Sequence, residues 1–121
     1  MESVAFFRRV ELNGLSWIPG SMVVCDLGGI VLEMNQRAAE TYQRYGGMEL
    51  VGKSLIDCHP EPARSKLLKL LEAGECNIYT IERNGTKKLI YQTPWYQNGL
   101  RRGMIELALE IPFDMPHFVR K

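Results

Sequence analysis

The sequence has little of what marks an exported, membrane-embedded or nucleic-acid-binding protein. Its three cysteines, Cys25, Cys58 and Cys76, are an odd number without close spacing, which favours reduced thiols over a disulfide framework or a zinc site. No apolar run could span a bilayer, and Val4 to Phe7 is too short for a signal peptide. The net charge of +1 gives no global field for nucleic acid or anionic lipid. We therefore expect a cytoplasmic single-domain protein without a metal site, a membrane contact or a nucleic-acid partner.

The N-terminal stretch ESVAFFRRVEL carries an apolar stripe at helical spacing. Val4, Phe6, Phe7 and Val10 form the stripe, and Asn13-Gly14 supplies a stop signal. We expect residues 1–17 to form an amphipathic cap helix outside the main core. Its apolar face must pack against the domain or against a second copy of the chain.

The first part of the main domain reads as a hairpin followed by a helix. Segments 22–27 and 30–35 are rich in β-formers and flank Gly28-Gly29, a hairpin signal. Asn35 is a credible N-cap for a helix over 36–45.

Residues 48–62 have no sustained period and predict short helical turns and loop. Residues 63–73 predict the clearest helix, because Ala63, Leu67, Leu70 and Leu71 share one face.

Three strands are predicted over 76–83, 86–96 and 102–111, with turns at Asn84-Gly85 and around residues 97–99. The last strand alternates cleanly. One set of its residues is expected to be buried (Ile105, Leu107, Leu109, Ile111) and the other to face solvent (Met104, Glu106, Glu110). Two strands, a group of short helices and three strands predict an α+β fold, a five-stranded antiparallel sheet flanked by short helices.

Four stretches, in this order and spacing, resemble a PAS domain. CDLGGIVLEMNQRAAETY is similar to the family's opening, where an aspartate, a glycine turn and a strand precede an asparagine and a helix. ELVGKSLIDCHP resembles the mid-domain segment, SKLLKLLEAG lies where the family keeps its long helix, and TPWYQNGLRRGMIEL is similar to the common ending. The resemblance covers roughly Ile18 to Ile111, so we expect a PAS domain over 18–112 and a C-terminal tail over 113–121.

The resemblance implies a sensory and protein-interaction module in bacterial-type signal transduction, without catalysis of its own. PAS domains hold small ligands between sheet and helices, and many dimerise through an N-terminal helix. It therefore implies a homodimer interface at Val4, Phe6, Phe7 and Val10. If these 121 residues are the whole protein, its output is expected to be contact with a separate signalling protein.

Five residues are candidates for the ligand pocket: His59, Leu67, Leu71, Tyr91 and Trp95. Tyr91 and Trp95 share one face of their strand, where they either pack in the core or form a pocket wall.

The dipeptide Cys58-His59 has several interpretations. His59 can be structural, with a ring nitrogen bonded to a backbone group, or it can contact a ligand. The resemblance also makes His59 a possible haem ligand, so a haem-based gas or redox sensor is an alternative. A flavin photosensor is disfavoured because its cysteine should directly follow the mid-domain glycine, and Cys58 comes three residues late. A small enzyme using Asp57, Cys58 or His59 as acid or base is an alternative of another class, although adjacent side chains rarely face each other.

Overall fold

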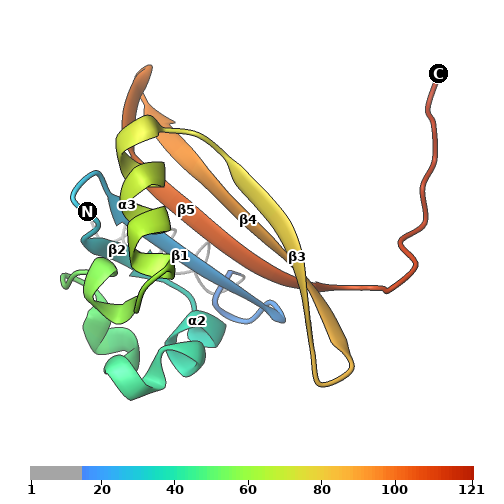
Figure 1. Cartoon of the computed structure of the whole chain (residues 1–121), viewed down its shortest axis with the longest axis horizontal. Coiled ribbons are helices and arrows are strands. Elements are labelled where there is room, and N and C mark those ends of the chain that lie inside the picture. The colour runs from blue at the N-terminus through green and yellow to red at the C-terminus, as the bar shows by residue number, and fades with distance from the viewer. Residues whose placement is uncertain (1–14) are drawn as a thin grey trace, which may run out of the picture.

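The computed structural model describes residues 15–121, which form one five-stranded antiparallel sheet with helices packed against it (Figure 1). The strand order is β2-β1-β5-β4-β3. This confirms the α+β fold predicted from the sequence. The predicted cap helix with Val4, Phe6, Phe7 and Val10 lies outside the described residues, apart from its last three positions. The strands are β1 Gly20–Asp26, β2 Val31–Met34, β3 Asn77–Arg83, β4 Thr86–Gln97 and β5 Leu100–Ile111.

Both predicted Asn-Gly turns join antiparallel strands. Asn84 and Gly85 connect β3 to β4 with φ values of 53° and 77°, and Asn98 and Gly99 connect β4 to β5 with 53° and 75°. Positive φ at both central residues is what a two-residue type I′ hairpin requires, and asparagine and glycine tolerate it best.

The helices begin where the sequence indicates, but the first is shorter than expected. Helix α2 spans Gln36–Thr41, and the chain continues as the 3-10 turns η1 Gln43–Tyr45 and η2 Gly47–Leu50. Gly46, with φ 110°, separates these two turns. A third turn, η3 Ile56–Cys58, precedes helix α3 Ala63–Ala73, which ends at Gly74 in the left-handed conformation.

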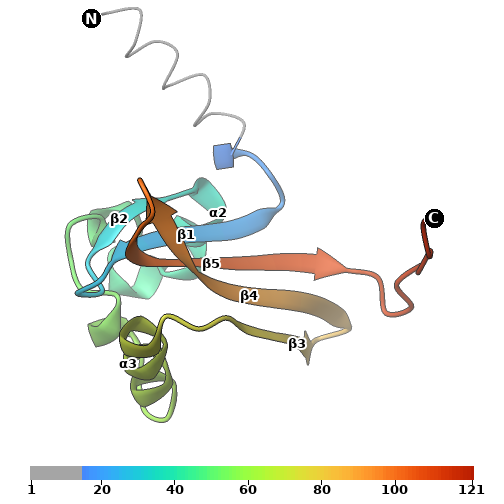
Figure 2. The ribbon, with the colours of Figure 1, turned by 90° about the horizontal axis from the view of Figure 1, so that it is seen from above.

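The sheet has two distinct faces. Helices α2 and α3 lie on one of them, here called the helix side; the other is the outer side (Figure 2). Val23, Glu106 and Gln92 are directly opposite one another on β1, β5 and β4, so they share a face. Val23 belongs to the core and Tyr42 bonds Glu106, so this face is the helix side.

The predicted burial of β5 is therefore reversed. Met104 is 3% exposed and packs in the core, and Glu106 lies beside it on the helix side. Leu107 and Leu109 occupy the half-buried outer side. Alternation identifies which residues share a face, but the side on which the helices pack decides which face is the core.

The helices cover only one end of the sheet. Strands β3, β4 and β5 project beyond them, and residues 112–121 leave β5 as an exposed segment without helix or strand (Figure 1). No helix in residues 15–121 is long and apolar enough to cross a membrane. The buried core lies beneath α2 and α3 and consists of Val23, Cys25, Val31, Met34, Ala38, Ala39, Leu50, Leu55, Cys58, Leu67, Leu71 and Met104.

Candidate functional site

A cleft of about 230 Å³ opens on the helix side, between α2 and the projecting ends of β3, β4 and β5. Its floor includes Ser21, Ile90 and Ala108 from three different strands. Pro19, Gly20 and Ile81 also line it, and charged and polar side chains contribute the rest of its surface: Arg37, Thr41, Tyr42, Arg83, Lys88, Glu106 and Glu110.

Glu106 accepts hydrogen bonds from two directions. Tyr42 Oη donates to its Oε1 over 3.4 Å, and Gln92 Nε2 donates to its Oε2 over 2.7 Å. Asn77 Nδ2 in turn donates to Gln92 Oε1 over 2.7 Å, which orients the Gln92 amide towards Glu106. Burial and the neighbouring Glu106 carboxylate raise the pKa of Tyr42, so its hydroxyl stays a proton donor. A carboxylate has more acceptor positions than these two bonds occupy.

Three basic side chains at the same cleft form no ion pair within 4.0 Å in the described part of the chain, although Glu110 lies opposite Lys88 and lines the cleft as well. Arg37 comes from α2, Arg83 from β3 and Lys88 from β4. Within residues 15–121, the one ion pair joins Arg64 to Asp57 at 3.6 Å, away from the cleft lining.

A second, smaller hollow of about 90 Å³ lies on the other side of Glu106, beside α3. Its lining includes His59, Leu67, Asn77, Gln92 and Glu106. Glu106 borders both hollows, so its carboxylate is the polar group that they share.

The structure brings two of the five candidate pocket residues together. His59 and Leu67 both line the smaller hollow, whereas Leu71 packs in the core. The His59 ring is held on two sides: its Nδ1 lies 2.8 Å from Leu55 O, and its centroid is 6.3 Å from that of Tyr42. The ring-to-backbone bond is the one expected of a structural histidine. A ligand role for these residues stays a prediction.

Tyr91 and Trp95 do share a face, as predicted, but it is the outer side. Their strand neighbours Ile90 and Gln92 are buried on the helix side, and successive side chains of a strand alternate. The two aromatics therefore cannot line a pocket between sheet and helices, which corrects the predicted placement. Trp95 lies opposite Gly103 and reaches past it, so that Nε1 donates to Cys25 O over 3.0 Å.

The chemistry suggested for Cys58-His59 does not fit this geometry. Cys58 Sγ faces Ser54 O at 3.8 Å, and the His59 ring is bonded to Leu55, so no thiol–imidazole pair forms. Burial, with a smaller effect of Asp57, raises the pKa of Cys58, which disfavours the thiolate that a nucleophile needs. Residues 15–121 contain no group of three or more His, Cys, Asp and Glu side chains able to hold a metal.

Haem does not fit beside His59 either. The hollow there measures about 90 Å³, whereas pockets for drug-sized ligands begin at about 300 Å³. A haem macrocycle needs at least that much room.

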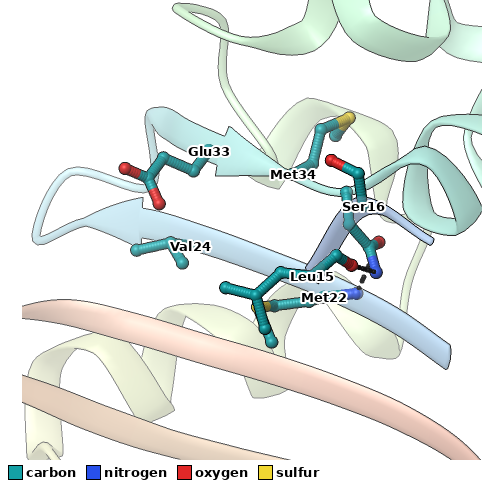
Figure 3. A pocket seen from close by; sticks show the side chains of 7 residues that line it. Leu15, Ser16, Met22, Val24, Glu33 and Met34 are labelled. Atoms are coloured by element: carbon teal, nitrogen blue, oxygen red, sulfur yellow. Dashed lines mark hydrogen bonds between the residues drawn. The ribbon is translucent and has the colours of Figure 1, made fainter. Parts of the chain in front are cut away.

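A groove of about 30 Å³, enough for about one water molecule, lies on the outer side where the chain enters β1 (Figure 3). Leu15, Met22 and Val24 line it, together with Glu33 on β2. Asn35 fixes this region: Nδ2 donates to Leu15 O (3.0 Å) and Gly20 O (2.7 Å), and Oδ1 accepts from Met22 N and Ala38 N (both 3.0 Å). One side chain thus ties the start of α2 to β1 and to residue 15.

Sequence reasoning missed Glu106, Gln92 and Tyr42 as site residues. The alternation of the last strand predicts that Glu106 faces solvent, opposite Ile105, Leu107 and Leu109. A usable signal was present, since Glu106 shares its face with Met104. Gln92 gave no signal, because its partner on β5 depends on the strand register.

Solved PAS structures resemble this fold. A PAS domain of an HTR-like protein from Haloarcula marismortui has a TM-score of 0.62 at 16% identity, covering 91% of this chain and 96% of that one. A sensory box sensor histidine kinase from Vibrio cholerae has a TM-score of 0.60 at 13% identity, covering 93% and 98%. VqmA from Vibrio cholerae, in a complex with ligand and DNA, has a TM-score of 0.61 at 18% identity, covering 86% of this chain and 50% of that one.

This chain therefore spans about half of the VqmA chain and nearly all of the other two. No family model matches the sequence, and no curated protein matches it. The structural likeness defines the fold as the PAS fold, as the sequence motifs indicated.

Proposed function

We propose that this chain is a non-catalytic cytoplasmic sensory module that binds a small ligand on the helix side of its sheet and signals through a homodimer or partner contact. The observation that carries the proposal is the 230 Å³ cleft, whose lining combines an incompletely bonded Glu106 with basic residues that form no ion pair within residues 15–121. The PAS neighbours support it, because one of them is a sensor histidine kinase and another is a complex with a ligand.

Ligand occupancy would act on the position of α2 relative to the strands. Arg37, Thr41 and Tyr42 reach the cleft from the helical segment, while Glu106 belongs to the sheet. A ligand that contacts both favours the arrangement in which they are closest. Asn35 caps α2 and bonds Leu15 O, so movement of α2 is transmitted to the residues that precede β1.

The first test is whether the protein carries a ligand. Native mass spectrometry of the purified chain should show a bound mass that is lost on denaturation. Glu106→Gln should reduce the bound fraction at least tenfold, because it removes the charge at the shared wall of the two hollows. Lys69→Gln, on the exposed part of α3, is the matched control. A bound mass that is unchanged in Glu106→Gln would place the ligand elsewhere.

We propose that the outer side carries the dimer contact, with Val4, Phe6, Phe7 and Val10 packing there. Leu107 and Leu109 present an apolar surface on the central strand β5. Leu107→Glu should halve the mass measured by light scattering, because the charge would be buried at the contact. Deleting residues 1–14 should do the same, and Lys69→Glu should not. If both variants remain dimers, neither the outer side nor the N-terminal residues form the interface, and the proposal is wrong.

A further inference from the structure

The geometry points to a second contact within the homodimer: we infer that residues 112–121 of one copy add as an antiparallel strand to the free edge of β3 in the other copy. This inference rests on the proposed function and deepens it, because it names where the C-terminal segment of each copy lies in the dimer. It follows from the exposed edge of the sheet and from the residue pattern of that segment, here called the tail.

Strand β3 is the long free edge of the sheet. Within residues 15–121 it pairs with β4 on one side and with no strand on the other. The opposite edge, β2, is shorter and is bonded to the loop that follows: Val31 N donates to Lys53 O over 2.9 Å, and Gly52 N donates to Val31 O over 2.7 Å. Three apolar residues of β3 are also exposed: Ile78, Tyr79 and Ile81. Proteins normally cover or blunt an edge strand of this kind.

The turn between β3 and β4 identifies which backbone groups of β3 are free. Arg83 and Thr86 flank the two-residue turn and are paired, so Arg83 O points to β4 as the acceptor of the turn's hydrogen bond. The backbone groups of successive residues point to alternate edges of a strand. The residues of β3 that point outward are therefore Ile78, Thr80 and Glu82. Their side chains lie on the outer side, where Ile78 is opposite Tyr91.

The tail has the pattern of an edge strand. Pro112 and Pro116 are 4 positions apart, so in an extended conformation both face the same edge, and neither supplies an N–H donor there. The other edge has a complete set of backbone donors and acceptors, from Phe113, Met115, His117 and Val119. The tail can therefore pair through one edge, while the prolines blunt its other edge against a further strand.

The same alternation gives the tail an apolar face. Phe113, Met115 and Val119 are 51%, 52% and 79% exposed, and in an extended strand their side chains share a face. They are also the residues of the bonding edge, so pairing with β3 places them on the outer side beside Ile78. The added strand thus continues the apolar surface that carries Leu107, where the dimer contact is proposed.

The two partners of this contact lie at the same end of the sheet. Strand β5 ends at Ile111, opposite Lys87 and beside the β3–β4 turn. Two copies related by a two-fold axis at this end can exchange their tails reciprocally. Each tail then runs along the other copy's β3 away from the turn, which is the antiparallel direction.

The register follows from the side chains that would be paired. When Val119 lies opposite Ile78, all three free residues of β3 have a partner and the two apolar side chains meet. Glu82 then lies opposite Met115, so no like charges are opposed. A shift by two residues in either direction would place His117 or Lys121 opposite Ile78.

The tail cannot make this pairing with its own β3. In the structure it continues away from the sheet, and Lys87 Nζ donates to Phe113 O over 3.3 Å (Figure 1). Folding back beyond β3 would cross three strand spacings, about 14 Å, which takes about four residues. Phe113 and Met115 would then lie in the crossing and not in the ladder, so the second copy is the occupant that fits.

The test is disulfide cross-linking between two variants of the full chain that are prepared separately, Ile78→Cys and Val119→Cys. Each also carries Cys76→Ser, which removes the exposed native thiol, whereas Cys25 and Cys58 are buried. Bonded residues of an antiparallel ladder have Cα atoms about 5.5 Å apart, within the range of a disulfide. We expect the oxidised mixture to give at least fivefold more linked dimer than a mixture in which Phe118→Cys, on the other face of the tail, replaces Val119→Cys.

Two proline variants test the alternation of the tail. His117→Pro removes a donor from the bonding edge and should reduce the cross-link at least fivefold. Asp114→Pro, the matched control, adds a proline to the edge that already holds Pro112 and Pro116 and should leave the cross-link unchanged. Both positions are exposed and lie outside helices and strands, so neither substitution should affect folding.

Three outcomes would overturn the inference: equal cross-linking of Val119→Cys and Phe118→Cys, an unchanged cross-link in His117→Pro, or a disulfide within one chain when both cysteines are placed in the same molecule. The proposed function is judged separately. The outer side holds the proposed dimer, so His117→Pro should keep the dimer mass in light scattering. A dimer without the cross-link contradicts the tail contact alone, whereas a monomeric unmodified chain contradicts the proposed dimer.

Discussion

Replacing Asn35 with alanine is expected to destabilise the protein by about 3 to 5 kcal/mol. The Asn35 side chain is 4% exposed and makes four hydrogen bonds, to Leu15 O, Gly20 O, Met22 N and Ala38 N. Alanine would leave these backbone groups without their partner in a place that water reaches poorly. The measurement is the free energy of unfolding from urea denaturation monitored by circular dichroism.

A second substitution separates the capping role of Asn35 from its other bonds. Aspartate caps helices as well as asparagine does, so Asn35→Asp would be neutral if capping were the whole function. We expect a loss of at least about 2 kcal/mol, because the carboxylate would face two carbonyl oxygens in place of the amide donor. Gln36→Ala, at the exposed neighbouring position, should change stability by less than about 0.5 kcal/mol. A neutral Asn35→Asp would contradict this account.

Gly103→Ala is expected to cost about 3 kcal/mol or more, at the upper end of overpacking effects. A Cβ at this position would overlap Cys25 O and lie 2.8 Å from the Asp26 backbone carbons. These obstacles are backbone atoms of the paired strand β1, so they cannot rotate away as a side chain could. The indole of Trp95, which reaches past Gly103 to Cys25 O, would also be displaced.

Two measurements on Gly103→Ala test this prediction: the midpoint of its unfolding transition and its tryptophan fluorescence emission. The midpoint should fall strongly, and the emission should shift as the Trp95 bond is lost. Gly28→Ala is the control, since its added Cβ would meet only Asp26 Oδ1 at 3.4 Å and its stability should change little. Equal stability of Gly103→Ala and Gly28→Ala would mean that β1 and β5 do not pack as closely as described.

The helices, the strands and the turns between them could be predicted from the sequence, because short local signals such as turn and cap residues specify them. Asn84-Gly85 and Asn98-Gly99 adopt the positive φ values that their residue types favour, and Asn35 caps α2 as expected. The fold class followed from the order of these elements. The predicted helix over 36–45 was too long, because Tyr42 and Tyr45 have helical spacing. The structure places Tyr42 at the end of α2 and Tyr45 beyond it.

The site was harder to predict because it depends on which face of the sheet the helices cover. Tyr91 and Trp95 were grouped correctly but assigned to the wrong side, and Glu106 was assigned to solvent. Apolar residues occupy both faces of β4 and β5, so hydrophobicity alone does not identify the core. Pairing between distant residues, such as Gln92 with Glu106, becomes visible only in the folded register.

The strand order has a consequence for how the molecule holds together. The hairpin β1–β2 and the hairpin β3–β4 are each local in sequence, and β5 alone is hydrogen-bonded to both of them. The sheet can therefore be completed only after β5, the last of its five strands in the sequence, has been synthesised. Without residues 100–111 the two hairpins share no hydrogen-bonded strand, and Glu106, an acid of the cleft, belongs to the strand that joins them.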